Sequence, residues 1–236
     1  MEVHHHSHTS RKKWTHYFWE FLMLFLAVFC GFLAENQREH FVEHQREKQY
    51  INSMIEDVRS DTAIFYKAIP RAKEILKRND SLLMELKNPE VFTNSKRAYY
   101  LWSESDYYYP FLYNDRTIQQ LKNSGGLRLV RNKNVSDSII EYDRHLRHLF
   151  SSQDRLDRLL LNNVHYTYKL FSTMSLSINQ NSPVPLLNTD KKFIEEVYGY
   201  RLELEDKMRD FIRNQQEAFR RGKRLIVYIK KEYHLK

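Results

Sequence analysis

Apolar residues are concentrated in one stretch near the start of the chain and otherwise recur at helical intervals. Residues 21–34 read FLMLFLAVFCGFLA and contain no charged side chain. At about 1.5 Å per residue they give ~21 Å of helix, and adding residues 17–20 extends this to ~27 Å, near the ~30 Å hydrocarbon core of a bilayer. The pattern predicts a membrane-spanning helix over residues 14–35.

A cleaved signal peptide and the buried helix of a soluble protein are the two alternatives to a retained anchor. A signal-peptidase site after Ala34 would place Phe32 at position −3, where a small residue is needed. Aromatic residues cluster at the start of the run, and such rings favour the headgroup level of a membrane. Both observations favour a retained anchor, whose residues we assign as Trp14, Tyr17, Trp19, Phe21, Leu24, Phe25, Val28 and Phe32.

The basic residues that flank this run bear on its orientation. Residues 11–13 are three contiguous basic side chains just before it, whereas Arg38, Arg46 and Lys48 are spread along the segment that follows. Because positive charge close to a span favours the cytoplasmic side, we expect a single-pass protein with a cytoplasmic N-terminus and its main domain on the other side of the membrane.

The segment after the run predicts one long helix whose surface changes along its length. Residues 36–50 are mostly polar, and apart from Phe41 the seam is polar there, which is typical of a solvated stalk. From Ile51 the apolar spacing of 4, 3, 7 and 4 is typical of bundle or coiled-coil packing. Pro70 is expected to kink or end this helix. The apolar residues that fall on one helical seam are Phe41, Ile51, Ile55, Val58, Phe65 and Ile69.

Further helices are predicted over residues 72–86, 95–105 and 117–124, followed by long ones over 134–174 and 190–232. Asn114 or Asp115 is expected to cap the third of these, and the glycines at 125 and 126 to end it. Residues 225–229, LIVYI, also fit a short strand, although no partner strand is evident. The predicted fold is all-α: an anchor, a stalk and an antiparallel helical bundle.

Composition agrees with this fold and places most of the net charge at one end. Five glycines and five prolines are too few for a β-sandwich or barrel. The only cysteine, Cys30, lies in the predicted span, so no disulfide framework exists. We therefore divide the chain into a disordered basic, histidine-containing tail (1–13), an anchor (14–35), a stalk (36–50) and a helical bundle domain (51–236).

The net charge of +8 comes mainly from the last thirty residues. Such a basic end is either a solvated helix face or a contact surface for membrane lipid or an acidic partner. Nucleic acid is not expected as a partner, because a domain outside the cytoplasm would not meet it. The candidate contact surface consists of Arg220, Arg221, Lys223, Arg224, Lys230 and Lys231.

An aromatic cluster surrounds Pro110 in the segment SDYYYPFLYND. It is predicted to be an apolar loop, which either packs across the end of the bundle or forms a ligand cleft or partner face. The candidate pocket residues are Tyr99, Trp102, Tyr107, Tyr108, Tyr109 and Tyr113.

Side chains suited to catalysis or metal binding are sparse. His40 and His44 share a helical face, as do His145 and His148, but neither pair has a third ligand or the His-Glu-x-x-His pattern. No Gly-x-Ser-x-Gly motif occurs. We therefore expect no metal, no cofactor and no enzymatic activity.

Two segments resemble a family of uncharacterised bacterial single-pass membrane proteins. They are HYFWEFLMLFLAVFCGFLAENQREHFVEHQREKQYI (16–51) and LKNSGGLRLVRNKNVSDSIIEYD (121–143). The resemblance implies an N-terminal span and a helical domain in a bacterial protein, so the expected location is the bacterial inner membrane, with the main domain in the periplasm. The family supplies no functional residues because its domain has no known function.

Two functional expectations follow from the sequence. The first is an envelope scaffold or interaction protein that binds a protein partner or forms a homo-oligomer through the seam 51–69 and the basic end. The second is a small-ligand binding or sensing domain that lacks an output module.

Overall fold

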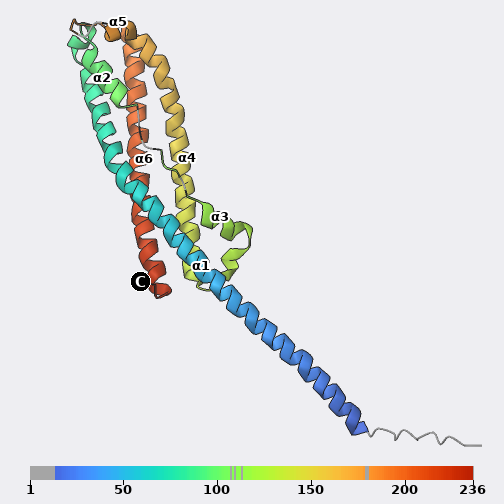
Figure 1. Cartoon of the computed structure of the whole chain (residues 1–236). Coiled ribbons are helices and arrows are strands. Elements are labelled where there is room, and N and C mark those ends of the chain that lie inside the picture. Colours follow the sequence, from blue (N-terminus) through green and yellow to red (C-terminus); the bar gives the residue numbers. More distant parts are fainter. Residues whose placement is uncertain (1–13, 107, 109, 113, 179–180, 236) are drawn as a thin grey trace, which may run out of the picture. The chain divides into compact units, whose positions relative to one another are not determined.

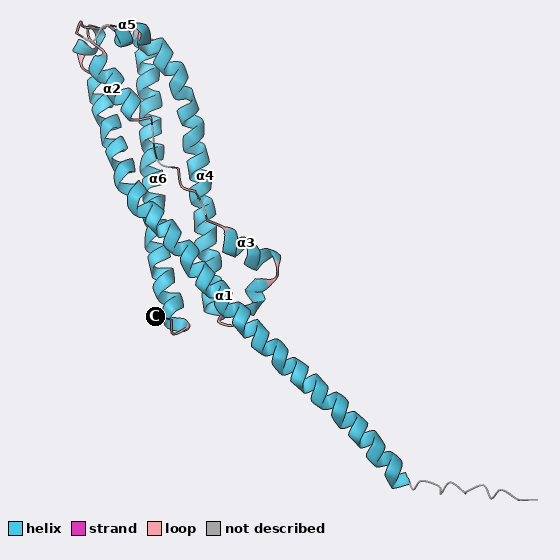
Figure 2. Cartoon of the chain, in the orientation of Figure 1, coloured by secondary structure: helices cyan, strands magenta, loops and turns pink. Residues whose placement is uncertain are grey.

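The computed structural model describes residues 14–106, 108, 110–112, 114–178 and 181–235, and within these ranges the fold is all-α. Figure 2 shows helices joined by loops, with no named strand in the described part of the chain. Phe171 and Leu186 form an isolated antiparallel bridge. The elements are α1 (Trp14–Glu85), η1 (Pro89–Phe92), α2 (Lys96–Glu104), α3 (Arg116–Asn123), η2 (Gly126–Leu129), α4 (Lys133–Leu170), α5 (Thr173–Ile178) and α6 (Lys191–Glu232).

Two compact units divide the chain between Gln49 and Tyr50. Helix α1 contributes to both, because it continues from Trp14 to Glu85. In the first unit the described residues, 14–49, are a single helix. The predicted disordered tail, residues 1–13, lies outside the described residues.

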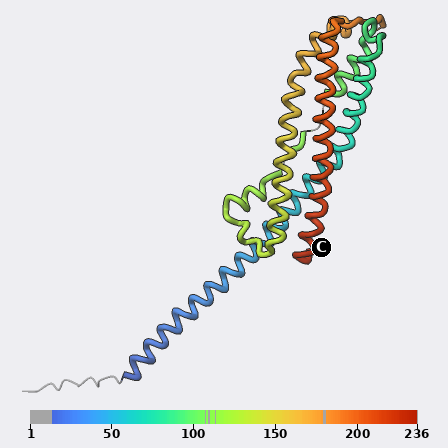
Figure 3. Tube along the Cα trace, turned by 180° about the vertical axis from the view of Figure 1, so that it is seen from behind, coloured from blue at the N-terminus to red at the C-terminus, as the bar shows by residue number. Residues whose placement is uncertain are grey.

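The second unit is a bundle of three long helical segments: the part of α1 after Tyr50, α4 and α6. Figures 1 and 3 show these segments side by side, with α6 running opposite to the other two. The chain returns from the end of α1 to the start of α4 through η1, α2, α3 and η2. Two long helices joined by a short turn would run in opposite directions. The long return path instead allows α1 and α4 to run in the same direction.

The bundle core forms two clusters of buried apolar side chains. The larger cluster joins all three long helices and includes Val58, Leu146 and Phe211. The smaller cluster is built around Trp102 and Phe171 and also contains residues of α1, α4 and α6. Burial of the apolar stripes of α4 and α6 explains why the helical periodicity of the sequence predicts these elements.

The seam of α1 that we expected to meet a partner lies inside this core instead. Ile51 is 1% exposed, and Val58 and Phe65 are fully buried. Phe65 stacks on Phe111 of the return segment, with 4.5 Å between ring centroids. The seam therefore stabilises the bundle itself, and the expectation that it forms an outer contact surface is wrong.

Helix α1 does not end at Pro70 but continues to Glu85, so the separate helix expected over residues 72–86 is its last part. The proline nitrogen carries no hydrogen, so the helical bond to the Tyr66 carbonyl cannot form. Figure 1 shows the helix axis turning within the cyan-to-teal part of α1. Packing on both sides of this turn keeps the segment helical.

Most predicted helix ends are confirmed. The Asn132 side chain accepts a hydrogen bond from the Val135 amide at 3.3 Å, and Asp190 accepts one from Phe193 at 2.9 Å. Gly125 ends α3 with φ 66°, a conformation that glycine adopts without a Cβ clash. The short strand considered at 225–229 is wrong, since these residues belong to α6.

Candidate functional site

The predicted anchor lies in the first unit, and its apolar side chains are exposed. Trp14 is 80% exposed, Trp19 61% and Val28 70%. Among the described residues, one helix is long and apolar enough to cross a membrane, and none of its apolar window is buried. The other assigned residues, Tyr17, Phe21, Leu24, Phe25 and Phe32, are also exposed. The structure thus places all eight on an uncovered helical segment.

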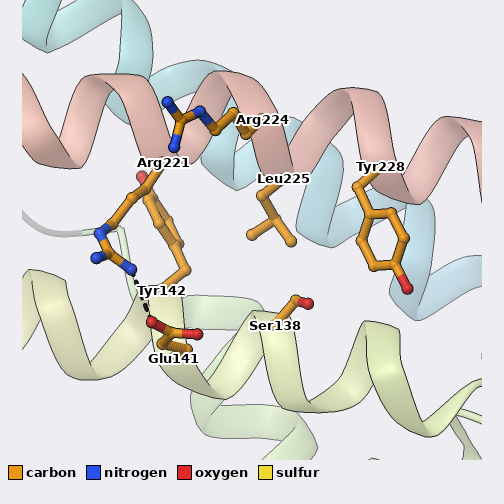
Figure 4. Close-up of a pocket in the computed structure, with 7 residues that line it drawn as sticks. All are labelled: Ser138, Glu141, Tyr142, Arg221, Arg224, Leu225 and Tyr228. Carbon is orange, nitrogen blue, oxygen red and sulfur yellow. Dashed lines mark hydrogen bonds and ion pairs between the residues drawn. The ribbon is translucent and has the colours of Figure 1, made fainter.

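A groove between α4 and α6 contains two of the six predicted basic contact residues. Arg221 and Arg224 line it from α6. Its volume is about 290 Å³. Figure 4 shows Leu225 and Tyr228 extending from α6 toward α4, while Arg224 stays at the α6 rim. The remaining lining residues, from α4, are Ser138, Glu141 and Tyr142.

The two arginines of this groove differ in their partners. Arg221 donates to Glu141 across the groove at 2.7 Å and to Glu217 on its own helix at 2.8 Å. The hydrogen bond with Glu141 is the main reason that its pKa is raised. Arg224 has no ion pair with any residue that the structure describes. Arg224 is thus the cation of this groove that is free to bind an incoming anion.

The other four predicted contact residues do not line this groove. Arg220 lines a more apolar depression with Phe65, Tyr66 and Phe219, with a volume of about 370 Å³. The Lys223 ammonium lies 5.5 Å from the Phe219 ring centroid. Lys230 is half-buried and Lys231 is exposed. The basic end is therefore divided among several helix faces and is not one continuous surface.

A second groove between the same helices is more polar. His148, Ser152 and Arg155 line it from α4, and its volume is about 380 Å³. Helix α6 contributes Lys207, Asp210, Arg213 and Asn214. The sequence indicates His148 only as half of a histidine pair. It does not indicate the other residues of the groove, because each belongs to the exposed polar face of a single helix and the groove exists only where α4 and α6 pack together.

The predicted aromatic pocket is divided between the two core clusters. Trp102 is fully buried in the smaller cluster. Tyr99 packs against that cluster and lines a shallow groove with Thr173 and Leu176. Tyr108 packs edge-on against Phe211 of the larger cluster, and its hydroxyl donates to Asp157. Tyr107, Tyr109 and Tyr113 lie outside the described residues. The described members thus do not line one cavity.

A buried arginine, which sequence reasoning missed, organises the smaller cluster. Arg201 is fully buried, and its guanidinium lies 4.0 Å from the Trp102 ring centroid. It donates to Ser105 Oγ at 2.6 Å and to Asn163 Oδ1 at 3.2 Å. Its ion pair is with Asp106 at 3.3 Å. One feature of the sequence could have indicated it: Arg201 lies where the apolar stripe of α6 is interrupted, between Val197 and Leu204.

Burial acts on both charges of this pair. It lowers the pKa of Arg201, although the Asp106 charge opposes the change. It raises the pKa of Asp106 to about 6, and the Arg201 charge opposes that change as well. A buried charge is tolerated when it is paired and hydrogen-bonded. We therefore assign the pair a structural role at the return segment.

The two histidine pairs lie in different units: His40 and His44 in the first, and His145 and His148 in the bundle. Among the described residues, no three potential metal-ligating side chains come together. In the first unit, His44 Nδ1 lies 3.2 Å from Glu47 Oε2. In the bundle, burial lowers the pKa of His145, and His148 is exposed at the polar groove. Each pair therefore lies on a helix face, where no third potential metal ligand joins it among the described residues.

Comparisons with known proteins add no relative. Neither family models, nor curated proteins, nor solved structures gave a match to this chain.

Proposed function

We propose that this chain is a single-pass membrane protein of the bacterial envelope, with a cytoplasmic N-terminus and a periplasmic helical domain. Its role is to hold or bind another protein, and not to catalyse a reaction. The observation that carries the proposal is the exposure of the apolar helical segment in the first unit. The resemblance to uncharacterised single-pass membrane proteins is consistent with this arrangement.

Exposure of this segment to water would be unfavourable. Burial of a large apolar side chain stabilises a protein by about 1.5–3 kcal/mol, and a side chain that stays in water does not contribute this free energy. Phe25, Val28 and Phe32 are each at least half exposed. A bilayer would cover these side chains from all sides, and Trp14 and Trp19 would lie near its interface. A membrane therefore explains both the composition of the segment and its lack of protein contacts.

The bundle offers the groove of Figure 4 as a contact surface. Arg224 is the cation there without an ion pair among the described residues, and Tyr228 and Leu225 provide apolar area beside it. Arginine and tyrosine are enriched among the residues that contribute most to binding at protein interfaces. We propose an acidic protein segment as the partner that this groove would bind.

Membrane attachment is tested by fractionation of cells and washing of the membranes with alkaline carbonate. The full chain should stay in the pellet. Leu24→Arg with Val28→Arg should release protein or reduce insertion, because each charge at the span centre costs about 2.5–3.5 kcal/mol. The control pair Leu161→Arg with Val164→Arg changes exposed residues of α4 and should leave the protein in the pellet. Recovery of the native chain in the wash would contradict the proposal.

Partner binding is tested by photocrosslinking in intact membranes. A photoreactive amino acid at Ser138, which lines the groove from α4 and leaves Arg224 in place, should give a discrete protein adduct. The same amino acid at Met84, an exposed residue of α1, should not. Absence of an adduct at Ser138, or the same adduct at both positions, would contradict an interaction role for the groove.

A second candidate function is small-ligand binding or sensing by the bundle. The observation that favours it is the polar groove around Ser152 and Arg155. Its volume lies in the range of about 300–1,000 Å³ that is typical of ligand sites.

A further inference from the structure

The polar groove between α4 and α6 contains a cation that is fixed in place without a carboxylate partner. Arg155 donates from Nη1 to Ser151 Oγ at 3.1 Å and from Nη2 to Ser152 Oγ at 3.0 Å. No ion pair joins it to any residue that the structure describes. Arg158, three residues later, pairs with Asp154 at 2.6 Å in the way expected of a solvated helix face. Arg155 differs from it in being held by hydroxyl groups.

Ser152 is the buried residue that holds this arrangement together. Its side chain is 8% exposed, and its hydroxyl donates to the His148 carbonyl at 3.1 Å. The same oxygen accepts from Arg155 at 3.0 Å and from Asn214 at 3.4 Å. Because the hydroxyl is fully used, it orients two donors from two different helices without competing for a ligand.

Several donor groups remain for a ligand. A guanidinium has five N–H groups, so Arg155 keeps about three after its two serine contacts. Asn214 keeps its second amide hydrogen. Lys207 and Arg213 add positive charge from α6, although Lys207 pairs with Asp206 and Arg213 pairs with Asp210. The groove thus combines one uncompensated arginine with two partly neutralised cations.

Phosphate is the anion that best fits this set of donors. Arginine forks match the oxygen spacing of phosphate, and charge-assisted hydrogen bonds to it are stronger than neutral ones. The groove, at about 380 Å³, has room for an organic group attached to the phosphate. The rest of its lining is also polar, as a sugar or similar group would require: it includes Asn214, His148 and the Asp210 carboxylate, whose charge is paired with Arg213.

We propose that this groove binds the phosphoryl group of a small, soluble phosphorylated molecule, with Arg155 as the main phosphate ligand. The proposal rests on the second candidate function, ligand binding by the bundle. It does not depend on the groove of Figure 4 or on a protein partner.

The test is calorimetric titration of the full chain in an uncharged maltoside detergent, with glucose 6-phosphate and inorganic phosphate as probes. Saturable binding of glucose 6-phosphate is expected, together with a ligand-dependent rise in unfolding temperature. Glucose at the same concentration should give no heat. Arg155→Ala should raise the dissociation constant roughly tenfold to hundredfold, as expected for loss of a charge-assisted contact.

Two further variants test whether a loss of ligand binding is specific to Arg155 and its position in the groove. Arg158→Ala removes the same charge from the same helix outside the groove and should change the constant less than about twofold. Ser152→Ala leaves Arg155 in place but removes its orientation, so an intermediate loss is expected. Unfolding temperatures without ligand show whether each variant is folded, and Arg155→Lys replaces Arg155→Ala if the latter is not.

Three outcomes would overturn the proposal. They are no saturable binding up to about 10 mM of either phosphate probe, equal losses in Arg155→Ala and Arg158→Ala, and binding seen only with vesicles containing anionic lipid. Membrane attachment and crosslinking at Ser138 are separate measurements, so a failure here leaves the role proposed for the protein as a whole unaffected.

Discussion

Asp61 is a carboxyl group in the bundle core, where an ionised form is poorly solvated. It is 1% exposed, and its Oδ2 accepts a hydrogen bond from the Tyr142 hydroxyl at 3.3 Å. Its other oxygen has no hydrogen-bond partner in the described part of the chain. Burial raises the pKa of Asp61 to about 7, against the opposing effects of Asn114 and Tyr142. The folded protein therefore holds a proton that the unfolded chain releases near its ordinary pKa of 3.8.

This shift predicts the pH dependence of an Asp61→Asn variant. Between pH 4 and 7 the folded state binds more protons at Asp61 than the unfolded state, so the stability contributed by this group falls as pH rises and is lost above about pH 7. Asparagine mimics the protonated form. Asp61→Asn should therefore raise the free energy of unfolding by about 1–3 kcal/mol more at pH 8.5 than at pH 5, because the carboxyl of the native protein loses its proton between these two pH values.

Urea unfolding of the full chain in detergent at both pH values measures this difference. Asp154→Asn is the control, since Asp154 is a 57% exposed side chain on α4 and should show no such pH dependence. An equal effect of Asp61→Asn at pH 5 and pH 8.5 would contradict the assigned protonation.

Close packing of helices depends on a glycine of α6 that faces the other two long helices. A Cβ atom added at Gly222 would lie 2.8 Å from Thr62 Cγ2 and 3.2 Å from the Tyr142 hydroxyl. The Thr62 methyl group is not free to rotate away, because its hydroxyl bonds to the Arg59 carbonyl at 2.8 Å. The glycine therefore sets how near α6 approaches α1 and α4.

Two glycine-to-alanine substitutions on α6 should have opposite signs. Gly222→Ala should lower the free energy of unfolding by about 1–2 kcal/mol, since overpacking exceeds the gain in helix propensity. Gly199→Ala meets no atom within 4 Å and should raise it by about 0.5–1 kcal/mol. Thermal or urea unfolding measures both. Stabilisation by Gly222→Ala would show that the helices can separate at little cost.

Local signals in the sequence predict most elements but not the contacts between them. The caps at Asn132 and Asp190 are of the local kind that such signals report, because each joins residues within three positions. Asp115 occupies the predicted cap position of α3, yet its side chain makes no capping bond. Asp57 of α1 supplies it, accepting from the Thr117 amide at 3.0 Å. Sixty residues separate these groups, and no local pattern reports such a contact.

The separation of contacting residues in the sequence also explains which parts of the candidate site were predictable. The residues assigned to the anchor lie within one apolar stretch, so composition and length single out this stretch without knowledge of the fold. Arg155 and Asn214 come together only when α4 and α6 are paired, and each alone is an ordinary polar residue of a helix face. Arg201 left a gap in an apolar stripe, but its partners Ser105 and Asn163 lie on other elements.

The basic residues on either side of the predicted span predict how the whole molecule is oriented in the membrane. Residues 11–13 are all basic and directly precede the aromatic start of the span, whereas the basic residues after it are dispersed. Positive charge close to a span is retained on the cytoplasmic side. The bundle and both α4–α6 grooves should then face the periplasm, where a phosphorylated ligand or a protein partner would have to be found.

Cysteine labelling in intact cells tests this orientation, because Cys30 is the only cysteine and can be replaced by serine. In that background, Lys223→Cys introduces a thiol at an exposed position of α6. A membrane-impermeant maleimide should label it once the outer membrane is permeabilised, without lysis. Thr9→Cys, before the span, should be labelled only after lysis. The reverse pattern would place the bundle in the cytoplasm, and a ligand or partner would then have to be sought among cytoplasmic molecules.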